Sequence, residues 1–272
     1  GATIHQINTV RKHISLFKGG QLAKLAAPAR VWSLILSDVV GDDLDVIGSG
    51  PTAPDASTFE TALAVLDNFG LRPSVPASVR DRLEKGAGET PKPGDSLFRG
   101  VENTLVGSNQ KSLDAAAVAA KALGYRTMIL ASTIEGETRD AARLHAAIAR
   151  QIRRYGQPLR APACVISGGE TTVTIRGEGK GGRNQEFALA AAIDIAGLRD
   201  TLILSAGTDG TDGPTDAAGA IADGETLRRS KRSAAESLRN NDSYPYFEDL
   251  RDLVVTGPTG TNVMDLHLIL IG

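Results

Sequence analysis

Three aspartates lie close together in the glycine-rich stretch SAGTDGTDGPTDAAGA, residues 205–220. This stretch follows the apolar run TLIL, which is typical of a buried strand. Like charges at this spacing repel unless a cation lies among them, and carboxylates at a strand end suit Mg²⁺ beside phosphates. The spacing does not match an EF-hand loop. We therefore expect Asp209 and Asp212 to hold a metal, with Asp209 as general base; solvent-exposed Asp-Gly turns are the alternative.

A second glycine-rich stretch, TIRGEGKGGRNQEFALAAA, contains the pattern G-x-G-x-x-G from Gly177 to Gly182. The pattern falls between a predicted strand and a predicted helix, as a dinucleotide fingerprint requires. Backbone amides at a helix N-terminus attract an anion, and Lys180 and Arg183 add two positive charges there. The stretch predicts an anion site; a flexible glycine loop is the alternative.

Further loops of glycine and hydroxyl residues follow predicted strands. Because strand ends of a parallel sheet meet at one edge, these loops are expected to converge where ligands usually bind, although each could be a simple turn. No Walker A pattern occurs in the sequence. The loops are 37–39, 48–52, 167–171 and 256–262, together with GSNQ at 107–110.

Strands and helices alternate along the chain, which indicates an α/β fold with largely parallel or mixed sheets flanked by helices. The polar, proline-rich segment GQPLRAP predicts a boundary between domains at 1–156 and 163–272. Expected strands are 31–36, 103–107, 126–132, 163–169, 171–176, 201–207, 253–257 and 266–272, and expected helices are 58–70, 76–88, 112–124, 136–156 and 184–197.

Composition excludes several classes of protein. The 272 residues are 41% hydrophobic, with a net charge of −2 and only 4% aromatic residues, so neither a nucleic-acid nor a membrane partner is expected. The single cysteine, Cys164, cannot form an internal disulfide, and it is expected to be a buried small hydrophobe in a cytoplasmic protein. The sequence begins without methionine inside a helical pattern, and we expect it to start within a domain.

The basic and histidine residues outside these loops carry little signal. The four histidines are scattered without metal spacing, which favours surface or core packing. The segment VRKH, residues 10–13, is expected to be a solvated helix face.

The stretches SGGETTVTIRGEGKGGRNQEFALA, SAGTDGTDGPTDAAGA and TGPTGTNVMDL resemble the C-terminal domain of the glycerate kinases of the MOFRL type, which in places carry the name hydroxypyruvate reductase. The first half, with INTVRKHIS, LILSDVVGDDLDVIGSGPT and VGSNQKSLDAA, resembles the later part of that family's N-terminal domain. The resemblance covers essentially the whole chain, and its long motifs occur in a fixed order.

This resemblance implies a two-domain enzyme with its active site in the interdomain cleft, which transfers a phosphoryl group from ATP to D-glycerate, typically giving 2-phosphoglycerate, with Mg²⁺. It implies that Arg183 is catalytic. Family chains begin with a further segment, containing a glycine-rich loop and an active-site lysine, that has no counterpart here. The residues expected to bind substrate or nucleotide are Ser37, Asp38, Ser49, Asn109, Gly168, Gly169, Glu170, Lys180, Gly182, Asn184, Thr259 and Asn262.

Two other functions stay open from the sequence: an NAD(P)H-dependent hydroxypyruvate reductase, and an inactive ligand-binding fragment of the kinase. In each, the partners are small molecules, and a homodimer is one arrangement that the resemblance allows. Replacing Arg183 by alanine is expected to lower kcat while changing the melting temperature by only a few degrees.

Overall fold

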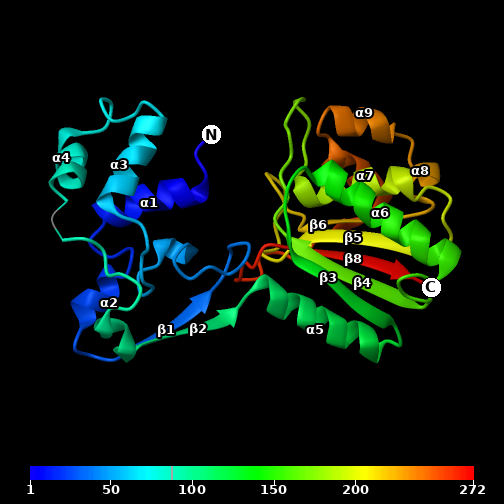
Figure 1. Cartoon of the computed structure of the whole chain (residues 1–272). Helices are drawn as coiled ribbons and strands as arrows, with labels where there is room; N and C mark the ends of the chain where they lie inside the picture. The colour runs from blue at the N-terminus through cyan, green and yellow to red at the C-terminus, as the bar shows by residue number, and fades with distance from the viewer. Residues whose placement is uncertain (87) are drawn as a thin grey trace. The chain divides into compact units, whose positions relative to one another are not determined.

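The computed structural model describes residues 1–86 and 88–272, which form two compact units, Gly1–Val106 and Gly107–Gly272 (Figure 1). This division differs from the boundary predicted at residues 156–163. The reason is that β3 (Arg126–Ile134) pairs with β4 (Ala163–Gly169), so both strands belong to one sheet. The boundary predicted between domains 1–156 and 163–272 therefore remains a prediction.

The first unit combines helices with a small sheet of two strands, β1 (Val31–Leu36) and β2 (Val101–Gly107). Its largest apolar cluster joins α3 and α4 through Phe59, Leu66 and Leu83. Its helical segments are α1 (Ile4–Ile14), α2 (Gln21–Ala26), η1 (Ile47–Ser49), α3 (Phe59–Asn68), α4 (Ala77–Lys85) and η2 (Ser96–Gly100).

The expectation that VRKH is a solvated face is wrong for its last two residues. Lys12 and His13 are only 4% and 1% exposed, because this side of α1 faces the inside of the unit. The Lys12 ammonium is neutralised by two carboxylates, at 2.9 Å from Asp45 and 3.3 Å from Asp55. A buried lysine is tolerated when it is paired in this way.

The second unit is built on a six-stranded mixed sheet in the order β3-β4-β8-β5-β6-β7. β3 and β4 are parallel, and the other neighbouring pairs are antiparallel. The remaining elements are α5 (Asn109–Ala122), α6 (Thr138–Tyr155), α7 (Arg183–Asp194), β5 (Thr201–Gly207), β6 (Gly219–Asp223), α8 (Thr226–Arg229), α9 (Ala234–Arg239), α10 (Ser243–Leu250), β7 (Leu253–Val254) and β8 (Asp265–Ile271).

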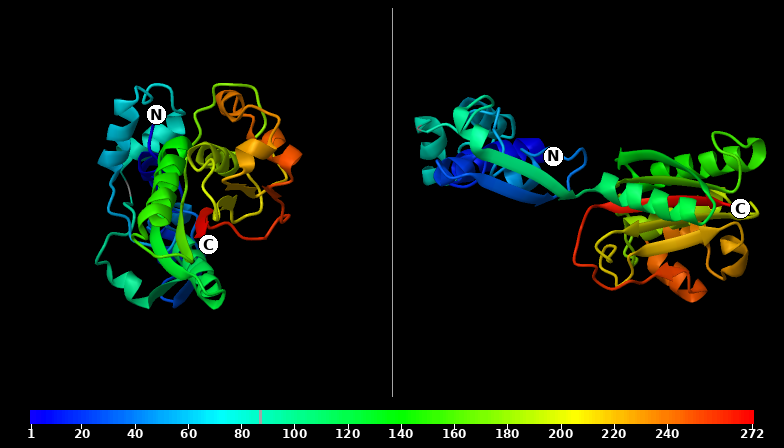
Figure 2. Two further views of the ribbon diagram at one scale, coloured as in Figure 1. Left: turned by 90° about the vertical axis from the view of Figure 1, so that its right-hand side faces the viewer. Right: turned by 90° about the horizontal axis from the view of Figure 1, so that it is seen from below.

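Two parts of this unit differ from the sequence prediction. Residues 171–176 do not form the expected strand; only Thr172 makes an isolated bridge, to Glu137. The stretch 219–250 carried no prediction and forms β6 and three short helices, coloured yellow to orange in Figure 2. Of these helices, α10 contacts β7 at the sheet edge.

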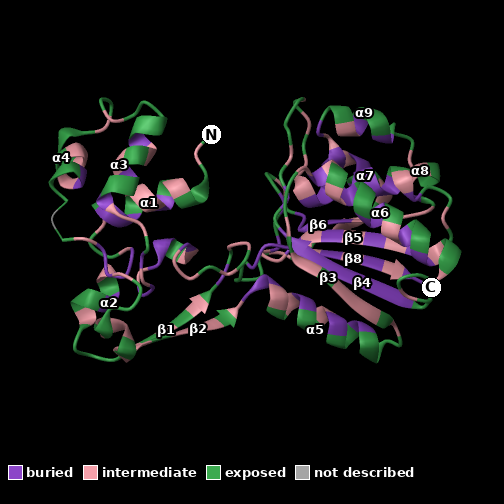
Figure 3. Ribbon diagram, viewed as in Figure 1, coloured by how far each residue is buried: buried purple, intermediate pink, exposed green. Residues whose placement is uncertain are grey.

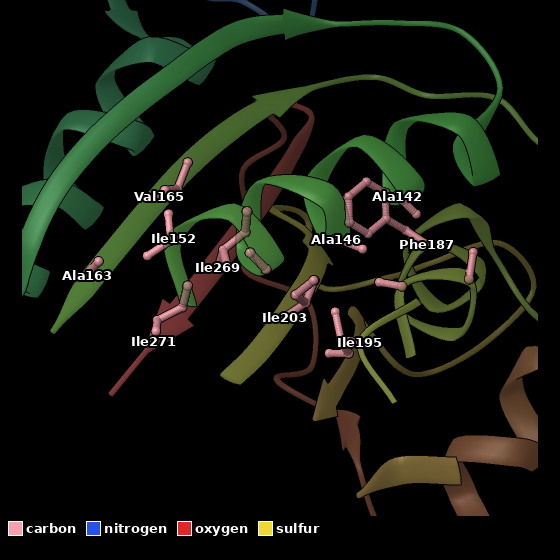
Figure 4. Close-up of a cluster of buried hydrophobic side chains, with 13 residues drawn as sticks. Ala142, Ala146, Ile152, Ala163, Val165, Phe187, Ile195, Ile203, Ile269 and Ile271 are labelled. Atoms are coloured by element: carbon pink, nitrogen blue, oxygen red, sulfur yellow. The ribbon is translucent and has the colours of Figure 1, made fainter. Parts of the chain in front are cut away.

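Helices cover both faces of the sheet, with α6 and α7 on one face and α5 on the other. Strand β4 is buried along its whole length (Figure 3), and its side chains divide between these layers. Val165 joins Phe187 and the isoleucines of β5 and β8 in the larger cluster (Figure 4), whereas Cys164 packs against α5. The buried position of Cys164 is therefore confirmed, and burial raises the pKa of its thiol to about 11. Among the residues described, no helix is sufficiently long and apolar to cross a membrane.

The predicted convergence of loops occurs at one edge of this sheet. Gly169 at the end of β4 and Gly207 at the end of β5 both pair with Asp265 at the start of β8. The loops that follow β4 and β5 therefore meet the loop that precedes β8. The loop 256–262 was expected at this edge because it would follow a parallel strand. It does lie there, but as the loop that precedes β8, which is antiparallel to both of its neighbours.

Candidate functional site

Arg183 is the first residue of α7 and lies at this sheet edge, held by two acidic residues. Its Nε and Nη2 donate to the two carboxylate oxygens of Asp265 at 2.6 and 3.1 Å, and its Nη1 lies 3.1 Å from Glu170. Asp265 is fully buried, whereas the Arg183 side chain is 33% exposed. One edge of the guanidinium is thus fixed by a bidentate pair, whereas the other contacts the half-exposed Glu170 and is partly accessible, so that an anion could meet it there.

Burial and ion pairing have opposite effects on the pKa values of Arg183 and Asp265. Burial alone would lower the pKa of Arg183, but the hydrogen bonds and charge of Asp265 raise it, so the guanidinium remains charged. Burial raises the pKa of Asp265, and the bonds from Arg183 and Asn184 oppose that increase. The carboxylate therefore depends on these partners for its charge.

A chain of buried hydrogen bonds orients Asp265 from behind. Asn184 donates its amide to Asp265 at 2.9 Å and accepts at Oδ1 from the Ser205 hydroxyl at 2.6 Å. Because that hydroxyl is the donor to Asn184, Nδ1 of His267, 2.8 Å away, must donate to it. Burial lowers the pKa of His267 well below its usual value, so the ring is neutral.

The sequence reasoning missed Asp265, Ser205 and His267. The available signal was a polar residue at a core position: β8 alternates buried and half-buried residues, and Asp265 and His267 share the buried face with Ile269. The histidines were expected at the surface or in core packing, and His267 is indeed buried, but its place in a polar network was not predicted.

Asp212, predicted to hold a metal with Asp209, caps the N-terminus of α7. Only 3% exposed, Asp212 accepts the backbone N–H groups of Asn184 at 3.0 Å and Gln185 at 2.9 Å, one on each oxygen. Burial raises the pKa of Asp212 to about 6, against the effect of these bonds. Gly182 is required beside it, since a Cβ there would lie 2.3 Å from the Asp212 carboxyl carbon.

The third aspartate of the stretch also has its own partner. Asp216 accepts from the Tyr244 hydroxyl at 2.7 Å, and Asp209 accepts the Thr211 N–H at 2.9 Å through one oxygen. Within residues 1–86 and 88–272, no group of three His, Cys, Asp or Glu side chains is arranged to hold a metal ion. Of the predicted ligands, Asp209 is half-buried and keeps an oxygen that does not serve as a cap.

The amides in the first part of the glycine loop bond to the chain itself. The N–H groups of residues 176 and 177 both bond to the side-chain oxygen of Asn241, and that of Lys180 bonds to Asp242 at 2.9 Å. The Lys180 ammonium lies 3.8 Å from the centre of the Tyr244 ring. Lys180 and these amides are therefore engaged within the chain, whereas Gly182 and Arg183, the other members of the predicted anion site, line a cavity; the anion site as a whole remains a prediction. The loop is also not loose, because a Cβ at Gly177 would lie 2.5 Å from Asn240.

Three predicted binding residues make structural contacts at this end of the sheet. The Asn109 amide at the start of α5 donates to the carbonyls of Val263 and Asp265, both at 2.8 Å. A Cβ at Gly168 would lie only 2.1 Å from Oδ1 of Asn109, and one at Gly169 would lie 2.2 Å from the carbonyl oxygen of Ile134. These contacts explain the two glycines by close packing.

Thr259 and Asn262 hold the loop before β8. The Thr259 hydroxyl donates to the carbonyl of Thr208 at 2.7 Å, and its N–H donates to that of Asp209 at 3.1 Å. Asn262 accepts the N–H of Met264 at 2.9 Å. Both residues therefore position Asp209 and Asp265 through the backbone.

A cavity of about 440 Å³ opens beside Arg183. It is surrounded by the segment after β4, the glycine loop and the middle of the aspartate stretch, at Gly213 and Pro214. Lys180 does not line it. The lining residues are Thr171, Thr172, Val173, Ile175, Gly179, Gly181, Gly182, Arg183, Glu186, Gly213, Pro214 and Asn241.

The three predicted residues of the first unit do not share one environment. Ser37 is fully buried and bonds within its own loop to Val39. Asp38 and Ser49 line a separate cavity formed by that unit alone.

Comparisons with known proteins agree with these features. Residues 163–265 match the model of the MOFRL family, and residues 1–84 match that of a domain of unknown function, DUF4147. Over its whole length the chain is 47% identical to the D-glycerate 2-kinase of Thermotoga maritima and covers 64% of that relative. It is 37% identical to the glycerate kinase of Macaca fascicularis, covering 80% of it.

The whole chain superposes on a crystal structure of the Thermotoga maritima glycerate kinase with a TM-score of 0.93, and it covers 64% of the length of that protein. The fold and site thus define an α/β protein with a MOFRL domain. The chain belongs to the glycerate kinase family of the MOFRL type. It spans slightly less than two thirds of the length of the Thermotoga relative.

Proposed function

We propose that this chain provides part or all of the active site of an ATP-dependent kinase that phosphorylates D-glycerate at its 2-hydroxyl. The observation that carries this proposal is the Arg183 guanidinium, fixed by Asp265 and open toward a cavity. Its support from relatives is a chain 47% identical to a protein named D-glycerate 2-kinase.

Arg183 is the group that neutralises charge in this reaction. Phosphoryl transfer depends chiefly on positioning and on stabilising charge over the phosphoryl oxygens. A guanidinium that is already oriented by a buried carboxylate needs no rearrangement to do this. It can equally hold the glycerate carboxylate, and Asp209 is proposed to orient the hydroxyl that attacks.

The residues at the site fit a weakly held Mg²⁺ rather than a closed metal cage. Mg²⁺ commonly binds through one or two carboxylates, with waters and substrate phosphates completing its shell. Asp209 would hold the ion, whereas Asp212 is occupied by the amides of α7. When bound, Mg²⁺ would supply positive charge to the phosphates. Asp209 is thus the only proposed ligand from the predicted pair.

The reductase alternative loses its main sequence support. In a dinucleotide site, the glycines let the backbone approach the pyrophosphate. Here Gly177 and Gly179 pack against Asn240 and Asp242, and their loop amides bond to the chain itself. The predicted homodimer and cytoplasmic location remain predictions.

A direct test measures ADP formation from ATP and D-glycerate by the wild-type chain and by Arg183→Lys. Lysine keeps the charge but loses the bidentate geometry, so kcat should fall about 10²-fold or more. Equal turnover in the variant refutes the role of Arg183. Binding of ATP without turnover would instead favour the inactive-fragment alternative, and binding of NADH in place of MgATP the reductase.

A further inference from the structure

Asn241 is a buried polar residue near Arg183 that the proposed mechanism does not use. It lines the same cavity as Arg183 and Gly182, and it is only 8% exposed. Its backbone is left-handed, with φ of 52°, a conformation that asparagine adopts more readily than most residues. A left-handed residue persists where its surroundings enforce it, so the contacts of this side chain indicate what it does.

Both ends of the Asn241 amide have partners that fix its orientation. Oδ1 accepts the backbone N–H groups of Arg176 at 2.8 Å and Gly177 at 3.0 Å, and such groups can only donate. Nδ2 donates to Oε2 of Glu186 at 3.0 Å, and an ionised carboxylate can only accept. The amide therefore cannot be reversed without losing these three hydrogen bonds.

Glu186, in the first turn of α7, links Asn241 to a second helix. Its side chain is 2% exposed, and Oε1 accepts from Nε of Arg139 on α6 at 2.7 Å. Nη2 of Arg139 in turn donates to the carbonyl of Leu238 on α9 at 2.6 Å. The side chains of Arg139, Glu186 and Asn241 thus join α6, the start of α7 and the segment that follows α9.

The glycine loop is bonded to this segment almost up to Arg183. The N–H groups of residues 176–180 donate to residues 240–242. A Cβ at Gly181 would lie 2.2 Å from the hydroxyl oxygen of Ser243, so the two backbones remain close there. These contacts reach to within two residues of Arg183. The placement of residues 240–243 therefore restricts where α7 can begin.

We infer that Asn241 is a positioning residue for Arg183, acting together with Glu186 and Arg139. One end of its amide holds the start of the glycine loop, and the other holds the first turn of α7. The loop must therefore enter the helix along one path, which places the guanidinium against the buried carboxylate of Asp265. An effect of Asn241 on turnover rests on the proposed function, whereas its positioning of Arg183 does not.

Reversing the polarity of the bond between Asn241 and Glu186 tests the inference. Asn241→Asp removes the donor and places a second carboxylate against that of Glu186, at the 3.0 Å that now separates donor and acceptor. Glu186→Gln turns an amide donor either toward Asn241 or toward Arg139, which are both donors. The double variant Asn241→Asp/Glu186→Gln has one donor and one acceptor again. It keeps acceptors for the loop amides and for Arg139, and it conserves the net charge.

The first measurement is the solvent exchange of the Arg183 Nε proton in the full chain, followed by NMR and assigned by its loss in Arg183→Lys. This proton is bonded to the buried Asp265 at 2.6 Å, so it should exchange slowly in the wild type. Each single variant should raise its exchange rate about tenfold or more, because the guanidinium leaves its partner more often. The double variant should return the rate to within about threefold of wild type.

The second measurement is kcat and the KM for ATP, at a temperature where every variant is folded. Each single variant should lower kcat about tenfold and change the KM by less than about threefold, because misplacing Arg183 affects mainly the transition state. The double variant should recover kcat. Thr226→Ala is the control: Thr226 is fully buried and bonds to Asp223 at the far end of β6, so its loss costs stability without touching the loop. It should leave kcat within about twofold of wild type.

Folded single variants that keep slow Arg183 exchange and wild-type kcat overturn the inference, even if their melting temperatures fall, because the role of Asn241 would then be structural only. A double variant that is no better than the single variants also overturns it. Asn241→Gly, which tolerates the φ of 52° and removes only the amide, replaces a single variant that does not fold. If the exchange rates follow the expected pattern but the wild type forms no ADP, the proposed function fails and the positioning of Arg183 stands.

Discussion

Replacing Arg183 by alanine should destabilise the protein substantially, contrary to the small effect expected from the sequence. The change would leave the fully buried carboxylate of Asp265 without an opposite charge and without two of its hydrogen bonds. Only the Asn184 amide, at 2.9 Å, would still bond to that carboxylate through its side chain. Burial of an uncompensated charge is among the most costly changes in a protein interior.

The magnitude follows from the geometry of the pair. Removing one partner of a buried ion pair costs about 3–5 kcal/mol. The Arg183 side chain is one-third exposed, so water can partly replace it, and a loss near the lower limit, about 3 kcal/mol, is expected. For a unit of this size, that corresponds to a fall in melting temperature of roughly 6–12 °C.

Urea and thermal unfolding of Arg183→Ala and of Arg183→Ala/Asp265→Asn separate this cause from others. The double variant has no unpaired charge, so it should recover stability to within about 1 kcal/mol of wild type. Burial raises the pKa of Asp265, so the folded single variant retains its proton more strongly than the unfolded chain. Its deficit should therefore grow as the pH rises above the ordinary pKa of an aspartate, about 4.

Arg150→Ala is the matched control, because its guanidinium pairs at the surface with Asp194 at 3.9 Å. It should change the free energy of unfolding by about 0.5 kcal/mol at most. If Arg183→Ala is as stable as this control, then Asp265 does not depend on Arg183 for its charge. A single variant and a double variant of equal, low stability would place the loss in packing instead.

Three shorter predictions concern the same unit. Asp212 has a pKa of about 6 in the fold against an ordinary 3.8, so the folded state binds its proton more tightly and wild-type stability falls as the pH rises through this range. Relative to wild type, Asp212→Asn should therefore gain about 2 kcal/mol in urea unfolding between about pH 4 and pH 7; a constant difference contradicts this origin. Gly168→Ala should lose about 2 kcal/mol or more in thermal unfolding, since its Cβ would overlap Asn109, whereas Gly100→Ala has room and should lose little. Lys180→Gln should leave the KM for ATP within about twofold, because its ammonium lies on an aromatic ring; a large increase in KM would restore Lys180 to the site.

The secondary structure that could be predicted is the part with strong periodicity. The apolar runs at 163–169 and 201–207 form β4 and β5 as expected, and the segment 136–156 contains α6. The alternating residues 171–176 misled the prediction, because they have no neighbouring strand to pair with along their length. Pairing partners and strand direction are decided by tertiary contacts, so the antiparallel placement of β8 could not be read from its own residues.

The candidate site was predictable only where residues form a local pattern. Arg183 was predictable because a cation at the N-terminus of a helix opposes the helix dipole, which indicates a role other than stabilising the helix. Asp265 supplies that reason from 82 residues further along the chain. No spacing rule links the two residues, so only the fold brings them together. The polar positions on the buried face of β8 were the one local hint.

The start of α7 combines features that would each be unfavourable alone. Arg183 opposes the helix dipole, and Asp212 and Asp265 are buried carboxylates, but together they neutralise the helix terminus and the cation. With Glu170 at 3.1 Å, carboxylates outnumber the guanidinium around this point. A free polyphosphate would be repelled by them. A nucleotide that arrives with a divalent cation meets less repulsion, which is the physical reason to propose MgATP rather than ATP as the ligand.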